Sequence, residues 1–449
     1  MGSYSGELII CILILISGSA LWGIDRLVNS SMKDDNRGVG DIVDNTPHEY
    51  AWVIRLCINS LGYATILFPG CLIYKYVRHS KYLQRNGNGC IHKLVHKCFV
   101  GQGDGGLLDS PSFPAPSSGT IQRTYMQEAA LLLYCFLGLQ ISYLTWGYLQ
   151  EKIMTQEYTD AEGNTGHFRN SQFLVFINRI LAFLMSGFYL LLKRQPRHTT
   201  PWYKYTFCSL SNILSSWFQY EALMYVSFPT QVLAKASKII PVMIMGKIIS
   251  RSKYEYYEYV TAILISIGMT FFMLGSREQH SDGATTASGI VLLGGYMVLD
   301  SFTSNWQNAL FNEYSVTSVQ MMCAVNMFSC MLTATSLLQQ SSFSISLEFM
   351  VKYPHFIIDC LLISICSATG QLYIFFTISK FGAVTFVIIM TFRQGLSILL
   401  SCLMYHHHIT ILGVLGILLV FGAIFLRIYC NHRIRMIKRR KAQLSNVNI

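Results

Sequence analysis

The sequence predicts an all-α integral membrane protein with about twelve spans. Apolar residues make up 52% of the 449 residues and charged residues only 13%, whereas a soluble globular protein carries about 25% charged residues. Apolar segments of about 20 residues, the length that crosses a bilayer as a helix, recur along the whole chain. The loops between them alternate between basic and acidic, as expected of a chain that crosses the membrane repeatedly.

The apolar segments divide the chain into four parts. The expected spans cover residues 7–24, 51–77, 127–150, 171–193, 203–221, 228–250, 256–275, 288–310, 317–338, 355–379, 384–404 and 409–430. The parts are an N-terminal extension with two spans and a linker (1–126), two five-helix halves (127–280 and 281–430) and a basic tail (431–449). The extension contains a Gly/Pro/Ser-rich linker at 101–120 that cannot bury enough apolar surface to fold.

The first apolar segment, at 7–24, is expected to be a retained span. A cleaved signal peptide is the alternative, but residues 1–7 carry no positive charge, which argues against it.

The charges of the loops predict the orientation of the chain. Basic residues dominate the loop 78–126 and the tail 431–449, and acidic residues dominate 25–49 and 151–170. If twelve spans alternate, the basic segments all fall on one side, which is then cytosolic, and both termini are cytosolic. Topology thus accounts for the net charge of +11, and no nucleic-acid partner is expected.

The two halves are expected to be inverted repeats, because each contains an odd number of spans. The fourth span of each half begins at an aromatic residue followed by a helix breaker, Phe228-Pro229 in one half and Phe381-Gly382 in the other. Lys238 and Arg393 follow these breaks by a distance of roughly 15–18 Å along their helices. Cations from both halves are therefore predicted near one depth in the membrane.

Lys235 and Lys238 are the most informative residues. A lysine near the bilayer centre costs about 3 kcal/mol, and residues three apart share one helix face. The pair predicts a site for a polyanion, to which Thr230 and Gln231 would add neutral hydrogen bonds. Snorkelling to the interface, or pairing with a carboxylate such as Asp300, is the alternative.

Further polar residues extend this predicted site. Arg393 offers a planar fork suited to phosphate or sulfate, with Gln394 beside it, although a structural ion pair would also explain the arginine. Tyr296, Asp300 and Asn305 make another span too polar to face lipid. Asp300 could pair with a lysine in the empty state or contact a base or ribose, and helix packing is the alternative role for the hydroxyl groups of this span.

Two other features give weaker evidence for a functional site. Gln371 could line the same cavity, but packing is the favoured role. The triplet His406–His408 suggests a metal or pH-sensing site, although solvated loop histidines explain it more simply. The sequence lacks motifs of phosphate-binding loops, zinc proteases and serine hydrolases, so neither an enzyme nor a cofactor or metal is expected.

Three segments resemble the signatures of a known family. They are Phe-Pro-Thr-Gln-Val-Leu-Ala-Lys-Ala-Ser-Lys at 228–238, Asp-Ser-Phe-Thr-Ser-Asn-Trp-Gln at 300–307 and Ile-Ile-Met-Thr-Phe-Arg-Gln at 388–394. Together they resemble the solute carrier family 35 nucleotide-sugar transporters, subfamily B, over roughly residues 127–430.

The resemblance implies the drug/metabolite transporter fold, with ten core helices as two inverted five-helix repeats and alternating access. It implies that Lys235, Lys238 and Arg393 bind the phosphates of the cargo. Gln394 stands where relatives often have lysine. In this respect the chain resembles the members of the family that carry adenosine 3'-phospho 5'-phosphosulfate (PAPS) across the Golgi membrane in exchange for an adenine nucleotide. The resemblance implies that the PAPS supplies sulfation.

Other cargoes and classes stay open from the residues alone. A UDP-sugar or ATP/ADP is anionic as well, and a membrane receptor or enzyme is the alternative from another class. The expected partners are the adenine nucleotide, the lipid bilayer and a second copy of the chain in a homodimer.

Overall fold

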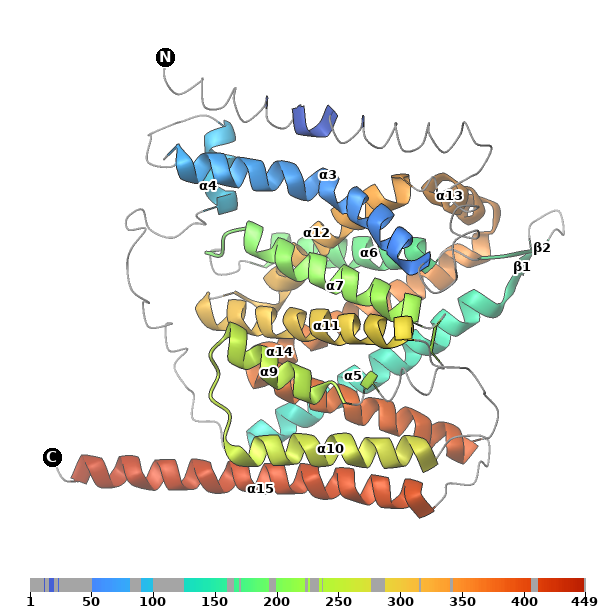
Figure 1. Ribbon diagram of the computed structural model, residues 1–449. Helices are drawn as coiled ribbons and strands as arrows, with labels where there is room; N and C mark the ends of the chain where they lie inside the picture. The colour runs from blue at the N-terminus through green and yellow to red at the C-terminus, as the bar shows by residue number, and fades with distance from the viewer. Residues whose placement is uncertain are drawn as a thin grey trace. The chain divides into compact units, whose positions relative to one another are not determined.

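The computed structural model is almost entirely helical (Figure 1). It describes residues 12, 16–19, 23, 51–80, 90–99, 125–159, 165–168, 171–193, 199–222, 225–226, 234–235, 237–275, 287–314, 316–339, 342–404 and 411–447. Its elements are α3 (Ala51–His79), α4 (Cys90–Phe99), α5 (Tyr125–Thr155), β1 (Glu157–Thr159), β2 (Thr165–His167), α6 (Ser171–Leu192), α7 (Tyr203–Ala222), α9 (Ile239–Ile249), α10 (Tyr256–Gly275), α11 (Ala287–Glu313), α12 (Ser318–Gln339), α13 (Ser342–Lys352), α14 (Pro354–Met404) and α15 (Ile411–Val447).

The helices agree with the predicted class of protein. Five helical segments within the described residues are long and apolar enough to cross a membrane: Met126–Gln150, Gln172–Leu192, Ala287–Glu313, Ser318–Leu338 and Pro354–Arg393. Shorter apolar helices cover Ile239–Ile249, Tyr256–Phe272 and Ile411–Arg427. The expected span at 7–24 lies mostly outside the described residues, and the linker at 101–120 lies wholly outside them.

The chain forms two compact units, each built from two separate stretches. The first unit comprises Met1–Ile213 and Leu310–Ser379, and the second comprises Leu214–Ala309 and Lys380–Ile449. Each unit therefore contains residues from both predicted halves of the core.

In the first unit, α12 packs against α3, α6 and α13. This unit contains an aromatic cluster, in which the tilted rings of Phe168 and Phe356 lie 4.6 Å apart and Tyr158 lies edge-on to Phe356 at 5.4 Å, measured between ring centroids. Phe168 and Phe356 are buried, as is Tyr158, so this cluster supplies apolar burial outside the helix–helix contacts.

A small antiparallel hairpin of β1 and β2 carries Tyr158 into this cluster. The Tyr158 hydroxyl donates to Asp359 Oδ2 at 3.0 Å, and Lys152 Nζ donates to Asp359 Oδ1 at 2.9 Å. Burial and the neighbouring carboxylate both raise the pKa of Tyr158 above its ordinary value. The hairpin, α4 and α13 lie between the predicted spans. The two helices have 10 and 11 residues, too few to cross a bilayer, and the strands are too short to leave a periodic pattern.

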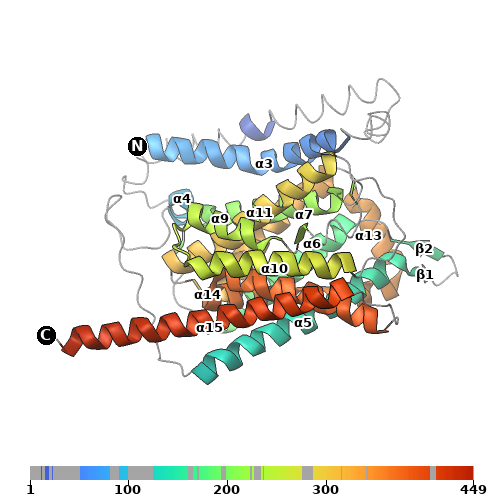
Figure 2. The same cartoon turned by 60° about the horizontal axis from the view of Figure 1, so that its bottom comes forward.

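In the second unit, α10 and α15 run side by side (Figures 1 and 2). They approach closely at glycines, since a side-chain carbon added at Gly416 would lie 2.5 Å from the Gly268 carbonyl oxygen and would also meet the backbone of Phe272. Small residues at a crossing allow helices in a membrane to pack backbone to backbone.

Helix α14 contains the break that the Phe381-Gly382 pair predicted. Gly382 has φ 83° and ψ 169°, and the residues on either side are helical. Because a residue with a side chain is strained at this φ, glycine is the residue suited to the position. The corresponding pair Phe228-Pro229 lies outside the described residues.

Candidate functional site

Lys235 and Lys238 lie at the N-terminal end of α9, within the second unit. The Lys238 amide donates to the Lys235 carbonyl at 3.4 Å, and the Val242 amide donates to the Lys238 carbonyl at 3.1 Å. Pro241 falls in the first turn of α9, where a missing backbone N–H is tolerated. The helix therefore begins directly after the two lysines, and the partial positive charge of its N-terminus adds to theirs.

Lys238 forms an ion pair with Asp300 of α11. The Lys238 side chain is 13% exposed and that of Asp300 is 23% exposed, so water screens the pair only in part. Of the two roles that the sequence left open for Asp300, pairing with a lysine is the one seen in this structure.

Arg393 brings a third cation to the same group. Its charge acts on Lys235, and the charge of Lys235 acts in turn on Lys238. Tyr296, one turn before Asp300 on α11, is buried and also lies within electrostatic range of Arg393. We call Lys235, Lys238 and Arg393 the cation cluster. Three like charges repel one another, and an arrangement of this kind suits a polyanionic ligand.

Asn305 holds α11 against α9 beside the cation cluster. Its amide nitrogen donates to the Val242 carbonyl at 2.8 Å and to the Ser301 carbonyl at 2.9 Å. Both amide hydrogens are thus bonded to backbone, and Asn305 is 1% exposed. These bonds favour a positioning role for Asn305 within the predicted site.

We expect Asn305→Ala to lower the free energy of unfolding by about 2 kcal/mol, because two buried hydrogen bonds of about 1 kcal/mol each are lost. Cargo affinity should change little once the change in stability is taken into account. Thermal unfolding and cargo titration of the purified variant check both statements. An affinity loss of about tenfold or more, corresponding to 1.4 kcal/mol, with unchanged stability would instead mean that Asn305 contacts the cargo.

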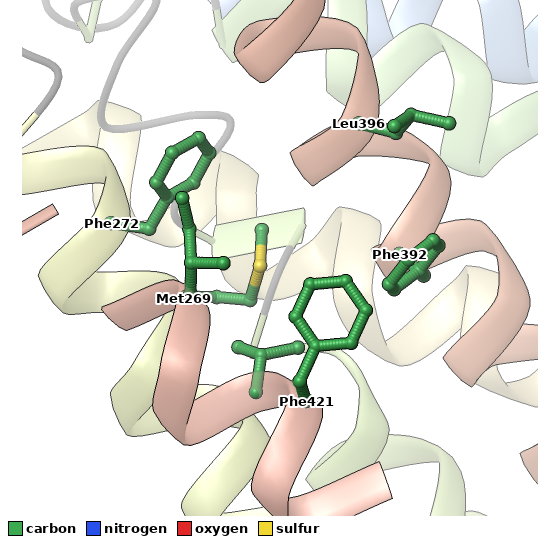
Figure 3. Close-up of a pocket in the computed structure, with 7 residues that line it drawn as sticks. Met269, Phe272, Phe392, Leu396 and Phe421 are labelled. Carbon is green, nitrogen blue, oxygen red and sulfur yellow. The ribbon is translucent and has the colours of Figure 1, made fainter. Parts of the chain in front are cut away.

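An apolar pocket lies elsewhere in the second unit, between α10, α14 and α15 (Figure 3). Its lining is wholly hydrophobic: Met269, Phe272, Phe392, Leu396, Ile417, Val420 and Phe421. Such a lining offers no hydrogen bond or charge to a phosphate, so this pocket does not qualify as a site for an anionic cargo.

Gln371 lies in the first unit, in a network of polar side chains that joins three helices. Its Oε1 accepts from Asn326 Nδ2 at 2.8 Å, and Asn326 Oδ1 accepts from Arg179 Nη1 at 3.4 Å. Gln371 and Asn326 are both buried. The sequence signal for this network was the presence of an arginine and an asparagine within two apolar spans.

The remaining predicted residues are placed only in part. Thr230 and Gln231 lie outside the described residues, and so does the triplet His406–His408. Gln394 belongs to α14, but its side chain is not among those described.

Comparison with known proteins points to a transporter. Residues 131–431 match the UAA transporter family. The chain is 50% identical over 444 residues to the Drosophila melanogaster protein named adenosine 3'-phospho 5'-phosphosulfate transporter 1, covering 97% of this chain and 96% of that protein. It is 50% identical over 403 residues to the human protein of the same name, covering 89% and 92%.

Plant relatives are more distant. The Arabidopsis thaliana protein named UDP-galactose/UDP-glucose transporter 5B is 35% identical over 307 residues, which cover 67% of this chain and 88% of that protein. Because the family match spans more than half of the chain and the animal relatives align over most of it, these similarities are not confined to one motif. The chain belongs to the UAA transporter family and is a transporter, not an enzyme.

Proposed function

We propose that this protein carries PAPS from the cytosol into the Golgi lumen, where the nucleotide serves sulfation. The observation that carries the proposal is the cation cluster of the second unit, in which Lys235 and Arg393 are electrostatic neighbours. The names of the animal relatives that align over most of the chain favour PAPS among anionic cargoes.

The charge of the cargo supports this assignment. PAPS carries about four negative charges near neutral pH, because a terminal phosphate ionises nearly twice. Three cations and the N-terminus of α9 would compensate most of that charge. In this proposal Lys235, Lys238 and Arg393 bind the phosphates and the sulfate, and Gln394 donates a neutral hydrogen bond to the sulfate.

The neutral residues complete the proposed site. Thr230, Gln231, Tyr296 and Gln371 would hydrogen-bond the uncharged parts of the cargo. Gln371 already bonds to Asn326, so that bond would have to open for contact with the cargo. Asn305 would act by holding α11 against α9, as its two bonds to backbone carbonyls indicate.

The transport cycle that we propose is alternating access between two inverted five-helix repeats, with PAPS exchanged for adenosine 3',5'-bisphosphate or another adenine nucleotide. The break at Gly382, which begins a span of the second repeat, is consistent with this architecture. Two further N-terminal spans, including α3, would precede the ten core helices.

The proposed setting is the Golgi membrane, with both termini cytosolic and the protein present as a homodimer. The basic loop at 78–126 and the basic tail at 431–449 support this orientation. Protease accessibility of tags at the two termini in sealed Golgi vesicles checks the orientation, and the mass of the purified protein checks the dimer.

Exchange in proteoliposomes tests the cargo. Vesicles preloaded with adenosine 3',5'-bisphosphate should take up labelled PAPS faster than empty vesicles, and excess unlabelled UDP-galactose should inhibit little. UDP-galactose is the sharpest competitor, because the plant relative is named for it. Equal uptake of UDP-galactose and PAPS would refute the assignment of PAPS as the cargo.

A further inference from the structure

The ion pair between Lys238 and Asp300 places a carboxylate on one member of the cation cluster. Both side chains are largely shielded from water, at 13% and 23% exposure. An ion pair in such surroundings is screened far less than one at the surface. The carboxylate of Asp300 therefore occupies a position that an anionic group of a cargo would also seek.

The packing of α9 against α11 keeps these two residues together. Asn305 bonds to the Val242 carbonyl at 2.8 Å, and Val242 and Asn305 lie about one turn beyond Lys238 and Asp300 on their respective helices. Two contacts one turn apart fix the register of the helices. Asp300 is thus held beside Lys238 by the packing of the second unit.

The charges of the cation cluster explain how the Lys238–Asp300 ion pair affects the empty site. Without a cargo, Lys235 is repelled by Arg393 and Lys238 is repelled by Lys235, and burying a lysine that has no counter-ion is costly. Asp300 removes part of that cost in the empty protein. When a phosphate or sulfate binds, the same carboxylate would repel it and compete for Lys238.

We propose that Asp300 is an internal counter-ion, which neutralises Lys238 while the site is empty and which the cargo displaces on binding. This inference rests on the proposed function, because it takes an anionic nucleotide as the cargo. In this proposal Asp300 competes with the cargo for Lys238, whereas a residue that binds the cargo would stabilise the complex. The carboxylate weakens cargo affinity, and it allows the empty transporter to change its orientation without exchange.

The test compares Asp300→Asn with wild type in proteoliposomes, with PAPS as the probe. The asparagine keeps the shape of the side chain and removes its charge. We expect the KM for PAPS to fall roughly three- to tenfold. The ratio of uptake into preloaded vesicles to uptake into empty vesicles should rise, because Lys238 has lost its counter-ion Asp300 when the empty variant reorients.

Glu258→Gln is the matched control. Glu258 Oε1 pairs with Arg427 at 3.3 Å in the same unit, with side-chain exposures of 19% and 15%, close to those of the Lys238–Asp300 pair. The same change of charge there should leave both the KM and the uptake ratio as in wild type.

Thermal unfolding without cargo gives a second measurement. Asp300→Asn should lower the melting temperature, and the double variant Lys238→Gln/Asp300→Asn should recover most of the loss, because it removes both charges. PAPS should raise the melting temperature of Asp300→Asn more than that of wild type.

The outcomes are separable. A lower KM with a higher uptake ratio supports the counter-ion, whereas an unchanged KM overturns it. A KM raised about tenfold in folded Asp300→Asn also overturns it, because Asp300 would then bind the cargo. If wild type fails to move PAPS at all, the proposed function fails instead, and the melting temperatures without cargo still report on the ion pair.

Discussion

Uptake of PAPS is expected to fall roughly 10- to 150-fold in Lys235→Ala, because one charge-assisted hydrogen bond to the cargo is worth about 1.5–3 kcal/mol. Thermal stability should be unchanged or slightly higher. Lys235 interacts unfavourably with the charge of Arg393, so its removal relieves repulsion in the empty protein. Initial rates of uptake in proteoliposomes and the melting temperature of the purified variant check the two statements.

Lys247→Ala is the control for this variant. Lys247 lies in the last turn of α9 and is exposed, so its loss should change neither uptake nor stability. Lys235→Ala that transports at the wild-type rate would refute the cation cluster as a binding site. A large fall in melting temperature would mean that the lysine has a structural role.

Gly416→Ala is expected to destabilise the protein by about 3 kcal/mol, near the upper end of the cost of overpacking. The added carbon would lie 2.5 Å from the Gly268 carbonyl oxygen, and because the obstacle is backbone, no side chain can rotate away. Helices α10 and α15 would have to separate. The melting temperature and the yield of monodisperse protein after extraction in detergent measure the loss.

Gly422→Ala is the matched control in the same helix, because a carbon added there meets no atom within 4 Å. It should be neutral or stabilising by up to about 1 kcal/mol, the difference in helix propensity between glycine and alanine. If the two alanine variants melt at the same temperature, the close crossing of α10 and α15 does not support the fold.

Much of the fold could be predicted because a bilayer leaves few alternatives to a helix for a long apolar segment. The break at Gly382 was also predictable, since a glycine following an aromatic residue interrupts an apolar run. The two compact units were not predictable from the pattern. Each combines stretches that are distant in the sequence, and hydropathy carries no record of which helices pack together.

For the candidate site, too, the residues could be predicted from the sequence but their packing partners could not. Buried cations are costly in a membrane, so Lys235, Lys238 and Arg393 stand out in the sequence. The hydrogen-bond partners of the polar residues cannot be read from the sequence, because those partners depend on how the helices pack. The sequence predicted that Asn305 contacts the cargo, whereas in the structure its side chain bonds to the Val242 carbonyl. Gln371 bonds to Asn326 of a different helix.

Titration of the purified protein with a series of adenosine compounds tests whether the cation cluster binds the cargo through its negative charges. The series is PAPS, adenosine 3',5'-bisphosphate, adenosine monophosphate and adenosine, which all keep the base. The first two each carry about four negative charges, adenosine monophosphate carries about two, and adenosine carries none. If the cation cluster binds the cargo, the two compounds of about four charges should bind most tightly, adenosine monophosphate should bind more weakly, and adenosine should show no measurable binding. Adenosine that binds as tightly as PAPS would contradict the account.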